Sequence, residues 1–190
     1  MRISSLQNYA RSVMLNFVQP TKEEVKQNGI DSRFLNPGEF HFGHSNCQIH
    51  TLLGSCIAIT LWHPKFLIGG MCHYMLPGSP IQNNVMVIKS NINARYSDLA
   101  MSLFEQNAIK YGTNLNEYQA KIFGGSNMFV NTAQREDKLI GLKNTEAAIK
   151  HLQKKHIPLV ASHVGTTGHR RIVFDVKSGG VWVKHAPLNS

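Results

Sequence analysis

The alternation of apolar runs and turn residues along the chain predicts more strands than helices. Strand-like runs rich in β-branched and apolar residues occupy 40–42, 48–53, 57–62, 67–72, 120–123, 159–164, 171–176 and 180–184. Apolar residues at three- to four-residue spacing predict helices over 98–111 and 145–156, the second beginning at Asn144. Because the strands outnumber the helices and arrive in hairpin-like runs, we expect an α+β fold with largely antiparallel β-sheets.

Two regions differ in their pattern. Residues 1–35 are expected to be an N-terminal extension, with a helical pattern between Leu6 and Phe17 and a polar stretch after it. Residues 36–190 are expected to form one domain, since a chain of 190 residues is long enough to bury a core without disulfides or metals.

One hairpin brings two reactive side chains together. The runs 57–62 and 67–72 flank His63-Pro64-Lys65-Phe66, and proline favours the second position of a turn. A turn centred between Pro64 and Lys65 pairs residues whose numbers sum to 129, and Cys56 and His73 satisfy that sum. Directly opposed residues share a sheet face, so the pattern predicts a thiol–imidazole pair, provided that no bulge shifts the register.

Cys56 ends the run Thr51-Leu52-Leu53-Gly54-Ser55-Cys56, where a Gly-Ser turn exposes backbone amides near the sulfur. The alternative interpretation is a small buried hydrophobe, which is what most free cysteines are. With His73 as base and backbone donors for an oxyanion, Cys56 has the surroundings of a nucleophile. Thr51 or His50, one of which faces the same side as Cys56, is the candidate for the third group that orients the base.

Composition narrows the class of protein. The chain is 42% hydrophobic and 16% charged, as in folded soluble proteins, and it contains no apolar stretch long enough to span a membrane. Without a signal-peptide pattern, and with only three cysteines that favour reduced thiols, we expect a cytoplasmic protein. A formal net charge of +9 favours acidic partners, although the basic residues are too scattered to indicate a nucleic-acid interface.

Three other motifs contain residue types that could form a site. The spacing of His41, His44, Cys47 and His50 suggests zinc, but these positions do not share one face of a strand, so no metal is expected. Gly124-Gly125-Ser126-Asn127 lacks the lysine of a phosphate loop and is expected to be a structural turn, with Asn127 free to line a cleft. Residues 165–171 are expected to be a hairpin loop whose Arg170 and Arg171 contact an acidic partner or solvent.

At these residues the chain resembles the chemoreceptor glutamine deamidases of bacterial chemotaxis, the CheD family. The matching segments run in family order over about 37–185: Thr51 to Cys56, Gly69 to Pro77, Arg95-Tyr96, Lys121 to Gly125, Ile140 to Asn144, Ile157 to Val160 and Gly168 to Arg171. The combination of Leu-Gly-Ser-Cys with a histidine 17 residues later is highly specific. Lys143 and residues 164–169 depart from the family pattern, and residues 1–35 lie outside it.

The resemblance implies hydrolysis of receptor glutamine side chains to glutamate, and methyl-ester hydrolysis is associated with the same family. Carried over by position, Cys56 is the nucleophile and His73 the general base. Thr51 is the third residue, although in some members the threonine lies one position earlier, where this chain has His50. No cofactor is implied. The implied fold is that of cysteine deamidases such as the cytotoxic necrotizing factor catalytic domain, with sheets flanked by helices.

The implied partners are the cytoplasmic domains of chemotaxis receptors and a phosphatase of the CheC type. A different hypothesis is a non-catalytic adaptor that binds receptors or such a phosphatase without turnover. The intact pair of Cys56 and His73 favours the enzyme, because a pure adaptor needs neither residue.

Overall fold

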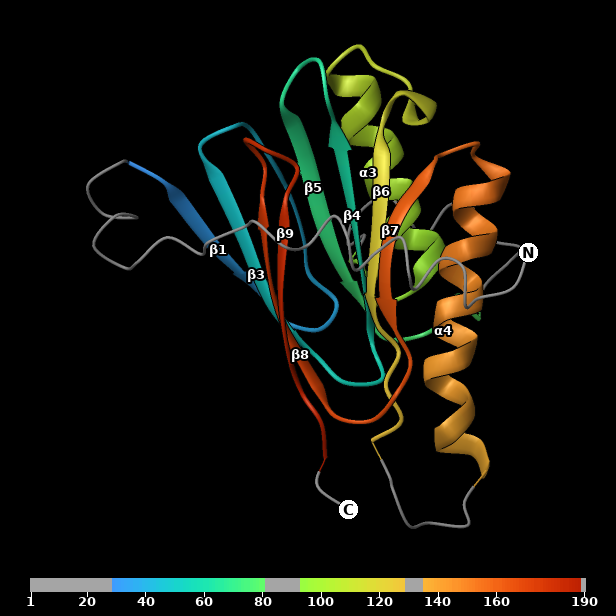
Figure 1. Cartoon of the computed structure of the whole chain (residues 1–190). Helices are drawn as coiled ribbons and strands as arrows, with labels where there is room; N and C mark the ends of the chain where they lie inside the picture. Colours follow the sequence, from blue (N-terminus) through green and yellow to red (C-terminus); the bar gives the residue numbers. More distant parts are fainter. Residues whose placement is uncertain (1–28, 81–92, 129–134, 189–190) are drawn as a thin grey trace.

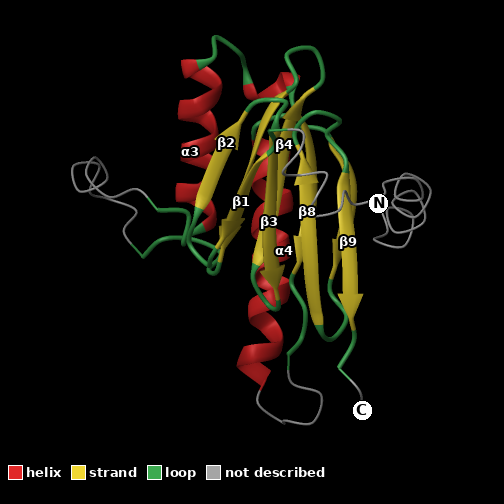
Figure 2. Cartoon of the chain, turned by 90° about the vertical axis from the view of Figure 1, so that its left-hand side faces the viewer, coloured by secondary structure: helices red, strands yellow, loops and turns green. Residues whose placement is uncertain are grey.

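Two β-sheets pack face to face, and two helices cover the outer face of one of them. The computed structural model describes residues 29–80, 93–128 and 135–188, apart from the side chains of 135–139. Figure 1 shows the sheets side by side with helices α3 and α4 beyond the second sheet, and Figure 2 views the first sheet from its open side. The predicted α+β class, with largely antiparallel sheets flanked by helices, is confirmed.

The sheets differ in how their strands pair. The first sheet has the order β1-β3-β8-β9, formed by Asp31–Leu35, Cys47–Leu53, His169–Asp175 and Val181–Ala186. The second has the order β2-β5-β4-β6-β7, formed by Phe40–Gly43, Ile68–Tyr74, Ile57–His63, Gln119–Gly124 and Leu159–Val164. Only β1 with β3 and β6 with β7 are parallel among the described pairs. Two of the antiparallel pairs, β4 with β5 and β8 with β9, are hairpins of consecutive strands, whereas the other antiparallel pairs join strands that are far apart in the sequence.

The core has two layers because the second sheet is buried on both faces. Helices α3 (Ser97–Lys110) and α4 (Arg135–Lys154), with the short 3₁₀ turn Leu115–Glu117, cover one face, where Tyr74, Phe104 and Ile122 pack. The other face meets the first sheet around Ile49, Met71 and Phe174. Strand β5 alternates between the layers, so that Cys72 faces the helices and Met71 faces the first sheet. Cys72 is therefore a core residue.

The β4–β5 hairpin is one residue further along than predicted. His63 pairs with Ile68, so the loop is 64–67 and paired residue numbers sum to 131 rather than 129. The His63 side chain accepts hydrogen bonds from the amides of Lys65 and Phe66, and Leu67 closes the turn at a φ of 50°. His73 therefore lies opposite Ala58, not Cys56. A shift of two in the sum keeps every side chain on its predicted face.

Three other sequence expectations need correction. Helix α4 begins at Arg135, so Asn144 lies inside it rather than at its start. Strands β7 and β8 belong to different sheets, so residues 165–168 cross between sheets and are not a hairpin loop. Residues 31–35 form β1, so the last residues assigned to the extension belong to the first sheet. The helical pattern between Leu6 and Phe17 lies outside the described residues.

Candidate active site between the two sheets

The backbone turn that carries Cys56 is held through three consecutive carbonyl groups. The carbonyl of Gly54 accepts a hydrogen bond from the Ser126 amide at 2.9 Å, and that of Cys56 accepts one from the Gly125 amide at 2.8 Å. Between them, the carbonyl of Ser55 accepts from the side-chain amide of Asn144 at 3.2 Å. The turn that presents the thiol is therefore fixed by the glycine turn after β6 and by helix α4.

Close approach explains the glycine at position 124. Gly124 has a φ of 109°, and a Cβ atom there would lie 2.1 Å from the carbonyl oxygen of Cys56. Any side chain would push the turn away and break the neighbouring bond from Gly125. The glycine turn is structural, as the sequence indicates, and what it supports is the Cys56 backbone.

Cys56 lies in the layer between the sheets, at the edge of its apolar cluster. The residue is partly exposed and packs against the cluster that contains Ala58, Met71 and Phe123. Ala58 is the direct cross-strand partner of His73, so Cys56 is the diagonal neighbour of His73 on the same face. Diagonal neighbours remain within reach of long or aromatic side chains.

A third strand fixes the orientation of the His73 ring. The Thr51 hydroxyl donates to the Leu35 carbonyl at 2.7 Å and lies 2.8 Å from Nδ1 of His73. Since the hydroxyl has one proton and gives it to Leu35, it accepts the Nδ1 proton of the ring. The other nitrogen, Nε2, then carries a free lone pair, and it is buried without a hydrogen-bond partner among the described residues. His73 is only 1% exposed.

Burial keeps both reactive groups neutral. It lowers the pKa of His73 to about 4, with weaker opposing contributions from a backbone hydrogen bond at Leu35 and from the charge of Glu39. Burial also raises the pKa of the Cys56 thiol, against a small lowering by its own backbone amide. At neutral pH the pair is therefore a thiol and a neutral imidazole rather than a thiolate beside an imidazolium.

The side chains of Thr51 and His50 point to opposite faces of β3. The Thr51 side chain is fully buried and points between the sheets at His73. His50 lies on the opposite face of β3, where its ring contacts the Ser32 hydroxyl at 3.1 Å. The difference follows from strand alternation, since neighbouring residues point to opposite faces.

The histidines whose spacing suggests zinc lie in different parts of the structure. His44 packs on Tyr111, with its Nε2 3.1 Å from the tyrosine hydroxyl, and His50 is on the outer face of the first sheet. His41 and Cys47 do come together, but with Asp31, a residue that the sequence pattern did not suggest. The donor atoms of these three residues lie within 4.8 Å of one another.

Two residues support the site in ways that the sequence did not reveal. Besides Ser55, Asn144 donates to the Met75 carbonyl at 2.8 Å, and thus links the Cys56 turn to the chain just beyond His73. Arg170, expected at an acidic partner or in solvent, is fully buried and contacts Ser126 and His163. Burial lowers its pKa to about 10. Nothing in the local sequence around Asn144 or Arg170 indicates these supporting roles.

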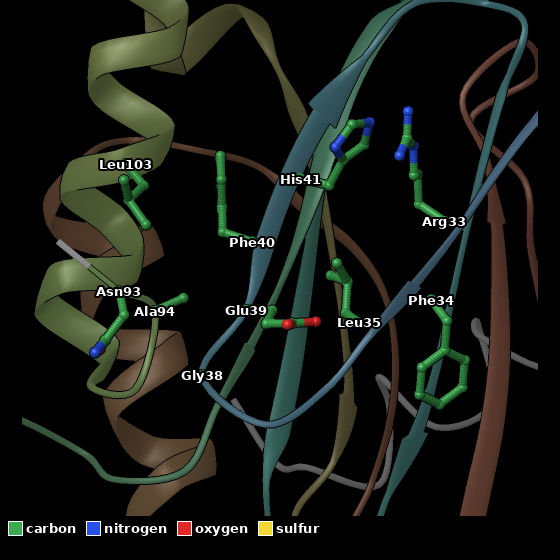
Figure 3. Close-up of a pocket in the computed structure, with 10 residues that line it drawn as sticks. All are labelled: Arg33, Phe34, Leu35, Gly38, Glu39, Phe40, His41, Asn93, Ala94 and Leu103. Atoms are coloured by element: carbon green, nitrogen blue, oxygen red, sulfur yellow. The ribbon is translucent and has the colours of Figure 1, made fainter. Parts of the chain in front are cut away.

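The pocket in Figure 3 is separate from these groups. It has a volume of about 370 Å³ and lies between β1, β2 and α3, with Leu35, Glu39 and Leu103 among its lining residues. Cys56, Thr51 and His73 do not line it. Its link to them is indirect, because Leu35 both lines the pocket and accepts the Thr51 hydroxyl.

Comparisons with known proteins place the chain in a family. A family model described as CheD chemotactic sensory transduction matches residues 75–185. The protein of Dechloromonas aromatica named "Probable chemoreceptor glutamine deamidase CheD 3" is 48% identical over 151 residues, covering 79% of this chain and 85% of that protein. The chain belongs to the CheD family.

Other CheD proteins match over a similar length. One from Pseudomonas savastanoi pv. phaseolicola is 41% identical over 165 residues, covering 85% of this chain and 89% of that protein. One from Leptospira interrogans is 37% identical over 159 residues, covering 80% and 90%. Both are named probable chemoreceptor glutamine deamidases. Among the described residues of this CheD protein, no helix is long and apolar enough to cross a membrane.

Proposed function

We propose that this protein hydrolyses glutamine side chains of chemotaxis receptors to glutamate, with Cys56 as nucleophile, His73 as general base and Thr51 as the residue that orients the base. The observation that carries the proposal is the contact between Thr51 and Nδ1, which leaves the buried Nε2 of His73 unprotonated on the face that Cys56 shares. The names of the relatives supply the substrate class.

The neutral resting pair determines how the reaction begins. Nε2 of His73 takes the Cys56 proton as the sulfur attacks the carboxamide carbon, so that thiolate forms only during the attack. The carbonyl oxygen becomes an oxyanion, and we propose the Cys56 amide, which already acts on the sulfur, as its backbone donor. The same imidazolium then gives its proton to the leaving nitrogen, the C–N bond breaks, and ammonia departs.

A thioester on Cys56 remains after ammonia leaves. Water loses a proton to Nε2 of His73 and attacks the thioester, the C–S bond breaks, and the proton returns to the sulfur. The sum is glutamine plus water giving glutamate plus ammonia, and no metal or organic cofactor takes part. A glutamate methyl ester would react by the same steps with methanol as the leaving group, which is the second activity we propose for the site.

The expected partners follow from charge. Receptor signalling domains are acidic helical rods in this proposal, and a chain with a net charge of +9 meets them by electrostatic attraction, at a rate that falls as salt rises. We place the reaction in the cytoplasm, where thiols stay reduced. A phosphatase of the CheC type is a further proposed partner.

Mass spectrometry tests the activity. A receptor cytoplasmic fragment incubated with the protein gains about one dalton for each amide converted to acid. We expect this gain with wild type, its loss with Cys56→Ala, and its retention with the control Cys72→Ala, since Cys72 faces the helices. An equal gain with Cys56→Ala would exclude the cysteine mechanism. Receptor binding by wild type without any mass gain would favour the adaptor instead.

A further inference from the structure

A second cluster of chemically reactive groups lies where the first strands of the chain meet. Asp31 begins β1, His41 lies on β2 and Cys47 begins β3, and their donor atoms are all within 4.8 Å of one another. Asp31 and Cys47 are direct cross-strand partners in the first sheet, whereas His41 belongs to the second. The cluster therefore bridges the two sheets.

The donor set suits one class of ligand. A thiolate, an imidazole and a carboxylate together are the ligands of Zn²⁺, which binds sulfur at about 2.3 Å and nitrogen or oxygen at about 2.0–2.2 Å. Tetrahedral coordination at these lengths places the ligand atoms about 3.2–3.7 Å apart, so the three side chains need to move by only about 1 Å. Cys47 is 2% exposed, while Asp31 and His41 are half-buried and leave the cluster open to solvent on one side.

Gly43 keeps the space beside the donor atoms free. A Cβ atom at this position would lie 3.1 Å from Sγ of Cys47 and 3.3 Å from Nε2 of His41. Gly43 has no left-handed backbone angle, so the conformation of the chain does not require glycine here. The missing side chain instead leaves room at the two softest donors.

We propose that Asp31, His41 and Cys47 bind one Zn²⁺, with solvent in the fourth position, and that the ion ties β1 to β2 and β3. The inference does not depend on the proposed function, because none of the three residues takes part in the deamidation steps. It does connect to that site through β1, whose last residue, Leu35, accepts the hydroxyl of Thr51.

Arg33 is the competitor of the metal. Its Nε lies 3.0 Å from Asp31 Oδ1, and Figure 3 shows its guanidinium beside the His41 ring. The Arg33 side chain is 56% exposed, so it can turn into solvent when a cation binds. The charge of Asp175 favours a bound cation, because its carboxylate is close enough to raise the pKa of Cys47.

Zinc titration of the purified full chain tests the proposal, with a chelating indicator as the readout. Wild type is expected to bind about one Zn²⁺ per chain. Cys47→Ser and His41→Gln are expected to weaken binding more than about 100-fold, since even residues outside the ligand shell change affinity by 10–100-fold. The matched controls His44→Gln and Cys56→Ser keep wild-type affinity. Co²⁺ adds a thiolate charge-transfer band that Cys47→Ser removes.

One variant separates the proposal from a loss of folding. Arg33→Gln removes the competing cation and is expected to bind Zn²⁺ several-fold more tightly than wild type. Misfolding cannot produce that gain. The proposal is overturned if wild type binds no Zn²⁺, if Arg33→Gln binds no more tightly, or if Cys56→Ser loses the metal while Cys47→Ser keeps it.

Discussion

Among the residues that the structure describes, two clusters combine a cysteine with a histidine, and their third members set them apart. In the cluster of Cys56 and His73 the third member is Thr51, a neutral hydroxyl that contacts the His73 ring. Cys47 and His41 are joined by Asp31, a carboxylate. Each third member belongs to the first sheet, and β1 reaches both clusters, with Asp31 at its start and Leu35 at its end.

The difference teaches that a cysteine and a histidine do not define a chemistry by themselves. Beside a hydroxyl, burial keeps His73 neutral and the Cys56 thiol protonated, which fits the base and nucleophile roles that we propose for them. Beside a carboxylate, burial and the charge of Asp31 raise the pKa of Cys47 to about 11, so its thiol is a poor nucleophile unless a cation replaces the proton. These surroundings favour the nucleophilic role that we propose for Cys56 and the metal-binding role that we propose for Cys47.

Exchange of each histidine is expected to give the largest contrast. His73→Gln removes the general base and should lower the deamidation rate by about 10²–10⁴-fold. His41→Gln should lower it by less than about tenfold, since His41 contacts no reacting atom. Single-turnover rates on a receptor fragment measure both variants. Similar losses in the two would erase the distinction between the clusters.

Acid should reveal how strongly His73 is held neutral. Its pKa is about 4 in the folded protein against an ordinary 6.5, so the unfolded chain binds more protons between these values. The contribution of neutral His73 to the free energy of unfolding is therefore fully present above about pH 6.5. The free energy of unfolding falls by about 3 kcal/mol as the pH drops to about 4. Denaturant unfolding at a series of pH values should show a shallower fall for His73→Gln. Parallel curves for the two proteins would contradict the shift.

Alkylation should distinguish the two thiols. At neutral pH, a pKa of about 11 gives Cys47 roughly 100-fold less thiolate than an ordinary cysteine, and its side chain is almost inaccessible. Cys56 is partly exposed, so iodoacetamide should modify it first, and peptide mapping over time measures the order. Faster reaction at Cys47 would mean that the second cluster is more open than the first.

Loss of the Thr51 hydroxyl should affect the deamidation rate less than loss of the His73 base does. Thr51→Val leaves Nδ1 of His73 without its partner, and we expect kcat to fall about tenfold with little change in KM. Thr51→Ser should restore most of the rate, because the hydroxyl alone makes the contact. His50→Gln, on the other face of the same strand, is the control. An equal loss in His50→Gln would remove Thr51 from its positioning role.

Strand alternation was the part of the site that the sequence could predict. The hairpin lies one residue further along than the sequence predicts, because the side-chain bonds of His63 and the left-handed Leu67 shift the four-residue turn from 63–66 to 64–67. The shift leaves every side chain on its predicted face, so Cys56 and His73 are diagonal neighbours on the same face rather than direct partners. Register errors of two preserve chemistry that errors of one would destroy.

Long-range packing was not predictable from local patterns. Asn144 resembles a helix start because asparagine is a good cap, yet its amide serves the turn at Ser55 in another element. Strands β7 and β8 follow each other across a glycine loop but lie in different sheets. Arg170, on β8, is buried against that connecting loop. The Asp31 cluster likewise depends on three strands meeting, which no spacing along the chain encodes.

Trapping the thioester tests the central claim, that the neutral Cys56–His73 pair attacks the glutamine carboxamide. Hydroxylamine added during the reaction competes with water for an acyl-enzyme and leaves a hydroxamate at the target residue, about 16 daltons heavier than glutamine. The account predicts that this product rises with hydroxylamine at the expense of glutamate in wild type and is absent in Cys56→Ala. Glutamate formation without any hydroxamate, or hydroxamate from Cys56→Ala, would contradict it.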